Sequence, residues 1–494
     1  MKNVLVIFVL TVAAGCTVGP NFRTPPAPAV KIYTEKPIAA QTVAAPGKAG
    51  VSQRLVYGQD IPGQWWRLFH SKQLDTLVRR AIKGSPTIAA AQASLRQAGE
   101  NLNARTATVL FPSVDGSFSP TRQKILDASY GFPGGGGSTF TLYNASVNVS
   151  YVFDVFGGER RELEALRAQV DYQRFLLAGA HLTLTANVAT AAIQEASLRA
   201  RIGATEQIVA SQQTGLEMVQ RRFALGGASR ADVLAQQAQL AQTKATLPPL
   251  EKQLAQTRVQ LAVLCGTFPA EGSLPEFRLE DLRLPGELPV SVPSSLVRQR
   301  PDIRASEELL HAAGAKIGVA TANLYPQISL TAALGSDATR LVDLFSPGTA
   351  IWSIGSSIAQ PLFHGGELLA RRRAAIAACD QAFAQYRQTV LLAFQDVADV
   401  LYALEADART LRAQAEAERV ARASLDLTEK QFQIGAVNYL TLLNGQRQYQ
   451  LALINLVEAR AARFADTAAL FQALGKGWWG NEQEEILPCP PAHR

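Results

Sequence analysis

The stretch RRFALGGASRADVLAQQ (221–237) returns later in the same chain as KQFQIGAVNYLTLLNGQ (430–446). The two copies align without a gap, with Phe223 opposite Phe432 and Gly226 opposite Gly435, at an offset of 209 residues (223 to 432). A unit of about 210 residues is far longer than the roughly 20 to 50 residues of a solenoid repeat. The sequence therefore predicts a duplicated half-molecule whose two halves share one architecture.

Each copy contains a helix end followed by a helix start. Gly226 and Gly435 can adopt the left-handed backbone conformation in which many helices end. Ser229 and Asn438 follow three residues later and are preferred N-cap residues. We therefore expect two helical hairpins. Their returning helices should cover 230–264 and 439–474.

Apolar residues recur every seven positions along the long helices that precede these turns. The series are Leu163, Val170, Leu177, Leu184, Ala191 and Leu198 in the first half, and Leu369, Ile376, Phe383, Val390, Val397, Leu404 and Leu411 in the second. A sustained seven-residue repeat keeps one seam against neighbouring helices and predicts coiled-coil packing. A helix of about 65 residues would be about 100 Å long, several times the thickness of a bilayer.

Short alternating runs bounded by turn residues predict a strand hairpin in each half. The first lies within 112–155, around a Gly-rich loop at 131–138, and the second comprises 327–334 and 351–362 around a loop at 337–348. Four strands are too few to close a barrel, which needs about eight. An open edge in lipid would leave backbone groups without partners. Three chains would supply twelve strands, and a tube of β on α would result.

The N-terminus has the pattern of a secretion signal. Lys2 precedes an apolar segment at 4–10, and Ala13-Ala14-Gly15 precedes Cys16 as a small-residue cleavage site. No later run of about 18 apolar residues is evident, so we expect no transmembrane helix. We divide the chain into a signal peptide (1–15), an extended N-terminal arm (16–62), a first repeat (63–266), a Pro-rich linker (267–293), a second repeat (294–476) and a C-terminal tail (477–494).

Residues that carry catalytic or metal chemistry are sparse. The net charge of +7 is spread along the chain, and the longest basic block is Arg371-Arg372-Arg373, so nucleic acid is not an expected partner. The five histidines share no metal-ligand spacing, and no phosphate loop or nucleophile elbow is present in the sequence. We therefore expect no enzyme activity, no cofactor and no metal, and an energy source supplied by a partner.

Several motifs together resemble the TolC-like outer-membrane efflux factors, in particular the lipoprotein branch that serves multidrug pumps of the RND type. They are the segment from Cys16 to Phe22, the pair Trp65-Trp66, the run 300–304 (RPDIR) and the run 435–447 (GAVNYLTLLNGQR). The resemblance implies a homotrimer with a twelve-stranded outer-membrane β-barrel that continues into a long periplasmic α-helical coiled-coil barrel. It also implies acylation of Cys16, which would anchor the chain in outer-membrane lipid. The implied partners are a periplasmic adaptor (membrane fusion protein) and an inner-membrane pump.

The resemblance also places the functional residues. It implies a periplasmic gate formed by Leu440, Asn444 and Arg447, which are seven residues apart from first to last and so share one helical face. The family has an Asp at the middle position that can pair with the Arg, whereas this chain has Asn444. We expect an Arg447 ring to hold a gate less tightly, unless Gln446 or Gln448 substitutes by hydrogen bonding. The implied adaptor-docking tips are the turns at Gly226, Gly227, Gly435 and Ala436.

The two copies of the repeat differ at the gate positions. Ala231, Ala235 and Ala238 occupy them in the first copy, which we therefore expect to form plain wall. The chain would then be the exit duct of a tripartite efflux system, passively exporting drugs or other small toxic molecules. An alternative is a periplasmic coiled-coil adaptor or scaffold lipoprotein without a channel. Two full-length repeats, each with a membrane-type strand hairpin, favour the duct.

Overall fold

The computed structural model describes residues 17–126, 136–271 and 274–475. The predicted signal peptide, Cys16 and the whole of the predicted tail (477–494) lie outside the described residues. The chain forms two compact units, which we describe separately. Unit 1 comprises residues 1–25, 94–173 and 305–387, and unit 2 comprises 26–93, 174–304 and 388–494. Each unit therefore contains segments of both halves of the duplication.

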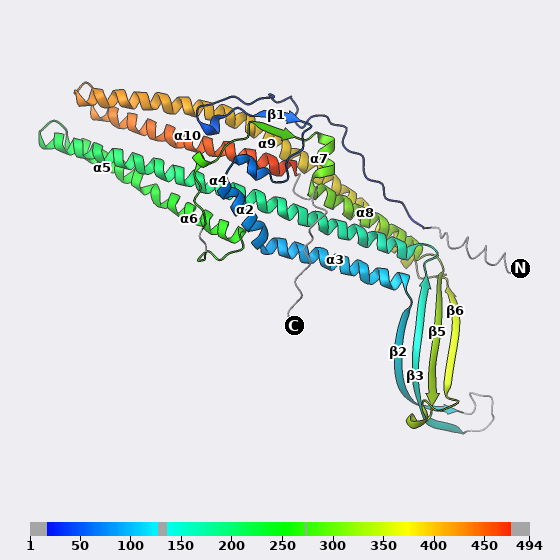
Figure 1. Cartoon of the computed structure of the whole chain (residues 1–494). Coiled ribbons are helices and arrows are strands. Elements are labelled where there is room, and N and C mark those ends of the chain that lie inside the picture. The colour runs from blue at the N-terminus through cyan, green and yellow to red at the C-terminus, as the bar shows by residue number, and fades with distance from the viewer. Residues whose placement is uncertain (1–16, 127–135, 272–273, 476–494) are drawn as a thin grey trace. The chain divides into compact units, whose positions relative to one another are not determined.

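Unit 1 contains a four-stranded antiparallel sheet (Figure 1). Its strands are, in order across the sheet, β2 (Ser113–Leu126), β3 (Gly137–Phe153), β5 (Gln327–Ala338) and β6 (Ala350–Ala359). Both predicted hairpins are confirmed, and they pair with each other through β3 and β5. The second hairpin differs at its ends, because β5 continues to Ala338 and β6 stops before Pro361, which cannot donate a ladder hydrogen bond.

The two faces of this sheet differ in chemistry, because residues paired across antiparallel strands share a face. The apolar face carries Val114, Phe118, Val147, Val149, Tyr151, Leu330, Leu334, Trp352, Ile354 and Ile358. The polar face carries Ser117, Ser119, Asn144, Ser146, Asn148, Ser150, Ser329, Thr331, Ser353 and Ser357. The outer edges of β2 and β6 pair with no other strand of the described chain.

Most of the remaining described residues lie in helices (Figure 1). They are α2 (Lys72–Gly84), α3 (Pro86–Leu110), α4 (Gly158–Ala224), α5 (Arg230–Ala245), α6 (Leu247–Leu264), α7 (Pro293–Gln299), α8 (Pro301–Ala322), α9 (Glu367–Gln433) and α10 (Tyr439–Leu474). The two long helices, α4 and α9, each have 67 residues. In unit 1, small side chains allow α4 and α8 to pack closely, with Ala165 and Ala168 against Ala312 and Ala315.

The predicted returning helix of the first half is wrong in one respect. It is two helices, α5 and α6, which meet at Thr246. The sequence Leu247-Pro248-Pro249 explains the break, because proline has no N–H to donate and suits the first turn of a new helix. The second half has no proline at the matching place, and α10 continues for 36 residues.

The N-terminal arm and the linker are more ordered than the sequence suggested. In unit 2, β1 (Arg54–Tyr57) of the arm pairs in parallel with β4 (Glu287–Val290) of the linker. Short 3-10 turns accompany them, namely η1 (Lys48–Gly50), η2 (Trp65–Phe69) and η4 (Leu279–Asp281). Strands of four residues are too short to show a recognisable alternation in sequence.

Side chains from η2 fill the core of unit 2. Trp65 packs against Phe471 with ring centroids 5.4 Å apart, and Phe69 packs against Phe464 at 6.3 Å. All four rings are almost completely buried. Trp65, singled out by the resemblance, therefore anchors η2, which directly follows the arm, to α10.

The heptad seams are confirmed for most of their length. Every member of the first series is buried or half-buried. In the second series Val390, Val397, Leu404 and Leu411 are buried in unit 2, whereas Leu369, Ile376 and Phe383 of unit 1 are exposed in the single chain.

By length and composition, one described helix could cross a membrane, which the sequence analysis did not expect. This helix is α4, and more than half of its most apolar window is buried within the protein. Burial of this kind is what a packed core helix shows, so the apolar window needs no membrane to explain it.

Candidate gate and docking site at the ends of the helical hairpins

The two hairpin turns in unit 2 have the same backbone geometry. Gly226 has a φ of 77° and Gly435 a φ of 78°, so the predicted left-handed conformation is confirmed at both positions. The N–H of Gly226 donates to the Phe223 carbonyl and that of Gly227 to the Arg222 carbonyl.

The second turn repeats this pair of bonds. Gly435 donates to Phe432 and Ala436 donates to Gln431. This pair of bonds is the Schellman motif, which satisfies two carbonyl groups at a helix end.

The predicted N-caps of the returning helices are also confirmed. The Ser229 hydroxyl accepts from the N–H of Asp232, whose carboxylate in turn accepts from the Ser229 N–H, so that α5 begins with a capping box. Asn438 caps α10 by accepting from the N–H of Thr441 at 3.0 Å.

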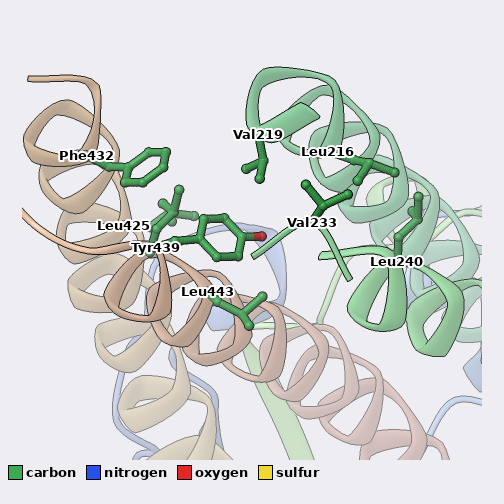
Figure 2. Close-up of a cluster of buried hydrophobic side chains, with 9 residues drawn as sticks. Leu216, Val219, Val233, Leu240, Leu425, Phe432, Tyr439 and Leu443 are labelled. Atoms are coloured by element: carbon green, nitrogen blue, oxygen red, sulfur yellow. The ribbon is translucent and has the colours of Figure 1, made fainter. Parts of the chain in front are cut away.

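The two hairpins meet in a cluster of buried apolar side chains close to their turns (Figure 2). Leu216, Val219, Val233 and Leu240 come from the first hairpin, and Leu425, Phe432, Tyr439, Leu442 and Leu443 come from the second. Arg222 extends this contact, because its guanidinium lies 4.4 Å from the centroid of the Phe432 ring and donates to the Gln433 carbonyl at 2.9 Å. The ends of the two hairpins thus pack directly against each other.

A layer of buried glutamines lies beside this cluster. Gln236 of α5 is completely buried, donates to the Gln212 carbonyl at 2.8 Å and accepts a short hydrogen bond from the Tyr439 hydroxyl. The side-chain amide of Gln212 and the amide oxygen of Gln446 have no hydrogen-bond partner among the described atoms. Unpaired buried amides cost free energy, so this layer is the less stable part of the contact between the hairpins.

Leu440, Asn444 and Arg447 share one exposed face of α10, as their spacing predicted. In the described chain Arg447 pairs with neither Gln446 nor Gln448. Its Nε instead donates to Oε1 of Gln239 on α5 at 2.6 Å, while Gln446 is buried inside the contact. The sequence could not show this pairing, because Gln239 and Arg447 are far apart in the chain.

The first copy also takes part in this contact. Gln236 and Gln239 supply the acceptors for Tyr439 and Arg447 of the second copy. Ala231, Ala235 and Ala238 stand at the positions aligned with the three predicted gate residues. The residues of this contact that the sequence did not point to are Gln236 and Gln239.

A buried charged group lies further along α10. Arg463 is 1 % exposed, donates to the Leu404 carbonyl of α9 at 3.0 Å and to the Thr42 hydroxyl of the arm at 3.3 Å. Burial and the hydrogen-bonded neighbour Asp407 raise the pKa of Asp466 to about 7. The contact with Asp407 acts in this direction because two carboxylates close together repel each other, which favours the protonated form of Asp466.

The run 300–304 forms a second polar junction in unit 2. Arg300 donates to the carboxylates of Asp302 at 2.7 Å and Asp396 at 2.9 Å, and to the carbonyl of Ala473 near the end of α10 at 2.8 Å. Hydrogen bonds to these carboxylates keep the pKa of Arg300 raised despite its burial. The run thus fastens the end of α10 to the start of α8.

Within unit 1, the segment that follows Cys16 is held against the start of α4. The N–H of Val18 donates to the Phe156 carbonyl at 3.1 Å. Arg161, which is buried on α4, donates to the carbonyls of Val18 and Gly19 and to Asn21. Cys16 itself lies outside the described residues, but its neighbour Thr17 packs beside Gly157 at the junction of β3 and α4.

The described residues contain no group of three His, Cys, Asp or Glu side chains placed to hold a metal. His311 is instead engaged by protein groups, since Nε2 lies 3.0 Å from Glu164 and the ring stacks on Phe22 at 4.3 Å. The described side chains of the site interact through packing and hydrogen bonds.

Comparison with known proteins agrees with this architecture. The profile of the family described as "Outer membrane efflux protein" matches residues 77–267 and 292–476. The chain is 32 % identical over 428 residues to the pyoverdine export outer membrane protein OpmQ of Pseudomonas aeruginosa, covering 85 % of this chain and 88 % of that protein. It is 30 % identical to the probable efflux pump outer membrane protein TtgC of Pseudomonas putida, covering 96 % of each.

Solved structures show the same fold. The outer-membrane channel OprN superposes with a TM-score of 0.83 at 29 % identity, covering 94 % of this chain and all of that one. The outer membrane protein VceC of Vibrio cholerae superposes with a TM-score of 0.78 at 25 % identity, covering 85 % and 100 %. The chain has the TolC-like fold and belongs to the outer membrane efflux protein family.

Proposed function

We propose that this protein is the outer-membrane exit duct of a tripartite efflux system. The observation that carries the proposal is the amphipathic sheet of unit 1 on a chain that belongs to the efflux family. A face of Trp, Ile, Leu and Val beside a face of Ser, Thr and Asn is the pattern of a membrane barrel wall. An adaptor or scaffold lipoprotein has no need of such a sheet.

Three chains form the duct in this proposal. The free edges of β2 and β6 pair between chains, because edge groups in lipid must find hydrogen-bond partners. Twelve strands then close the barrel. Leu369, Ile376 and Phe383, which are exposed in the single chain, become contacts between neighbouring chains in the trimer.

The helical hairpins form the periplasmic part and its controlled end. Leu440, Asn444 and Arg447 line the gate from the exposed face of α10. Gly226, Gly227, Gly435 and Ala436 form the tips that dock on a periplasmic adaptor, which links the duct to an inner-membrane pump of the RND type. Acylation of Cys16 adds a lipid anchor to the chain.

The cargo is a class of small molecules set by the pump. The relatives carry names that refer to pyoverdine, toluene and antibiotics at similar identity to this chain. A passive duct lined by small hydroxyl and amide groups suits such variety. Drugs or other small toxic molecules therefore remain the proposed cargo.

The test is complementation in an efflux-deficient host that expresses the cognate adaptor and pump. We expect restored resistance, and a trimer that survives mild detergent and dissociates on heating. A chain that stays monomeric and peripheral after its lipid anchor is removed would support the adaptor or scaffold instead.

A further inference from the structure

The apolar face of the sheet is hollowed near the loop that joins β5 to β6. We call this feature the loop-end hollow; its lining includes Gly116, Phe118, Ala145, Val147, Leu334 and Phe345. Its volume is about 670 Å³, within the range of small-ligand sites. Small residues create it, since a Cβ added at Gly116 would meet nothing within 4 Å.

The loop beside the hollow is fixed on the apolar side of the sheet. The Ser336 hydroxyl donates to the Leu344 carbonyl and lies 2.6 Å from the Thr349 hydroxyl. Leu344 is buried, whereas Val342 and Phe345 are 77 % and 82 % exposed. Large apolar side chains held outward in this way are costly in water and suit contact with acyl chains.

Two cations lie beyond the hollow on the same face. Arg122 and Lys124 follow Phe118 by four and six residues on β2, which places them about 13 and 20 Å further along the strand. Both are exposed, and neither has an ion-pair partner among the described residues. Arg340 at the base of the loop adds a third cation, which Asp343 partly offsets at 3.7 Å.

Along β2, the apolar hollow thus lies nearer the helices and the positive charges lie further from them. If the chain is the proposed duct, its helices enter the sheet from the periplasmic side, so the loop end reaches the outer leaflet. A lipid of that leaflet would place its acyl chains at the level of the hollow and its headgroup at the level of the cations.

We infer that the loop-end hollow, with Arg122 and Lys124, binds a phosphorylated, acylated glycolipid of the outer leaflet. One acyl chain fills the hollow and a phosphate accepts hydrogen bonds from the two basic side chains. A zwitterionic phospholipid fits less well, because its own ammonium group already neutralises its phosphate. The inference rests on the proposed function, which gives the sheet its membrane.

The test is native mass spectrometry of the purified full-length protein, incubated with bisphosphorylated lipid A or with phosphatidylethanolamine as probes. We expect lipid A to be retained at least tenfold better than phosphatidylethanolamine. The double variant Arg122→Gln/Lys124→Gln should lose about tenfold in lipid A retention. Gly116→Leu, which fills the hollow, should lose a similar factor.

Matched controls separate the site from general lipid contact. Arg372→Gln/Arg373→Gln removes the same charge from exposed positions on α9, and Gly355→Leu adds the same bulk on the polar face, where its Cβ meets only the Thr331 hydroxyl at 3.6 Å. Both controls should retain lipid A as the parent protein does.

Efflux complementation by each variant keeps the two proposals apart. Unchanged lipid A retention in both site variants, or equal retention of the two probes, would overturn the lipid site while a complementing protein upholds the duct. A parent chain that binds lipid A but never supports efflux would instead count against the duct.

Discussion

The hairpin that turns at Gly226 and the hairpin that turns at Gly435 share their turn down to the individual hydrogen bonds, yet their returning helices differ. In the first, α5 ends after 16 residues and has alanines at the positions aligned with the proposed gate. In the second, α10 runs for 36 residues and presents Leu440, Asn444 and Arg447. The backbone of the turn was retained after duplication, and the side chains beyond it diverged.

The two copies therefore have different roles in the contact between the hairpins. Tyr439 and Arg447 donate from the second copy, and Gln236 and Gln239 accept in the first. Both donors therefore link α10 to α5. Changes to the donors test whether the second copy controls the contact.

The largest expected effect comes from Tyr439→Ala. It removes a ring from the buried cluster and leaves Gln236 without its donor, which should destabilise the contact by about 3 to 5 kcal/mol. Hydrogen exchange should speed up across residues 425–443 while the sheet of unit 1 stays protected. Vancomycin entry into a host carrying the variant should rise.

Two further variants sharpen this result. Tyr439→Phe keeps the ring and should cost only about 1 kcal/mol. Arg230→Ala changes the aligned residue of the first copy, which is exposed, and should have almost no effect. Equal losses from Tyr439→Ala and Arg230→Ala would show that the copies are equivalent.

The sequence was enough to predict the hairpins, because local chemistry decides them. Gly226, Ser229, Gly435 and Asn438 act on bonds within a few residues of themselves. The heptad series likewise predicts which face of a single helix is buried. Pro248 and Pro249 are the sequence signal for the break at Thr246. The prediction relied on periodicity alone and therefore extended one helix across the break.

The partners within the site could not be predicted in the same way. Gln239 pairs with Arg447 across 208 residues of sequence, and glutamine is equally common on solvated helix faces. The pairing of β1 with β4 joins segments that are 233 residues apart at Arg54 and Glu287. Such contacts depend on tertiary packing, for which one sequence holds no local signal.

A smaller effect is expected from Arg447→Ala. Loss of the hydrogen bond to Gln239 should weaken the contact by about 1 to 2 kcal/mol, since the donor is charged but exposed. Single-channel conductance and vancomycin entry should both increase.

Gln239→Ala should reproduce the effect of Arg447→Ala, and the double variant should add little to either. Fully additive effects would mean that the two side chains act separately. Unchanged conductance and leakage in Arg447→Ala would remove this residue from the proposed gate.

Asp466, together with its neighbour Asp407, should make the stability of the second copy depend on pH. Asp466 aligns with Thr257, a neutral residue that donates to the Gln253 carbonyl at 2.9 Å. Because its folded pKa of about 7 lies above the reference value of 3.8, the folded state binds more protons between these values. Its contribution to stability is therefore present below about pH 4 and is lost as pH rises through 7.

Hydrogen exchange in the middle of α10 should accordingly speed up between pH 5 and 8, after correction for the intrinsic pH dependence of exchange. Asp466→Asn should flatten this dependence, since it cannot ionise, and Thr257→Val should leave it unchanged. A persistent dependence in Asp466→Asn would assign it to another group.

The smallest effects concern the turns themselves. Gly226→Ala has room for its methyl group but must adopt a positive φ, so it should cost about 1 kcal/mol. Gly227→Ala needs no positive φ and only reproduces Ala436 of the second copy, so its stability should change by less than about 0.5 kcal/mol.

Bulk at the same positions tests docking separately from folding. Gly227→Trp should keep the trimer and the turn but abolish pump-dependent resistance, because the ring projects from an exposed tip. The matching Ala436→Trp shows whether both tips touch the adaptor. If both variants lose resistance, the turn that the two copies share is the docking element. If only one variant loses it, the two copies differ at the proposed tips as they do at the proposed gate.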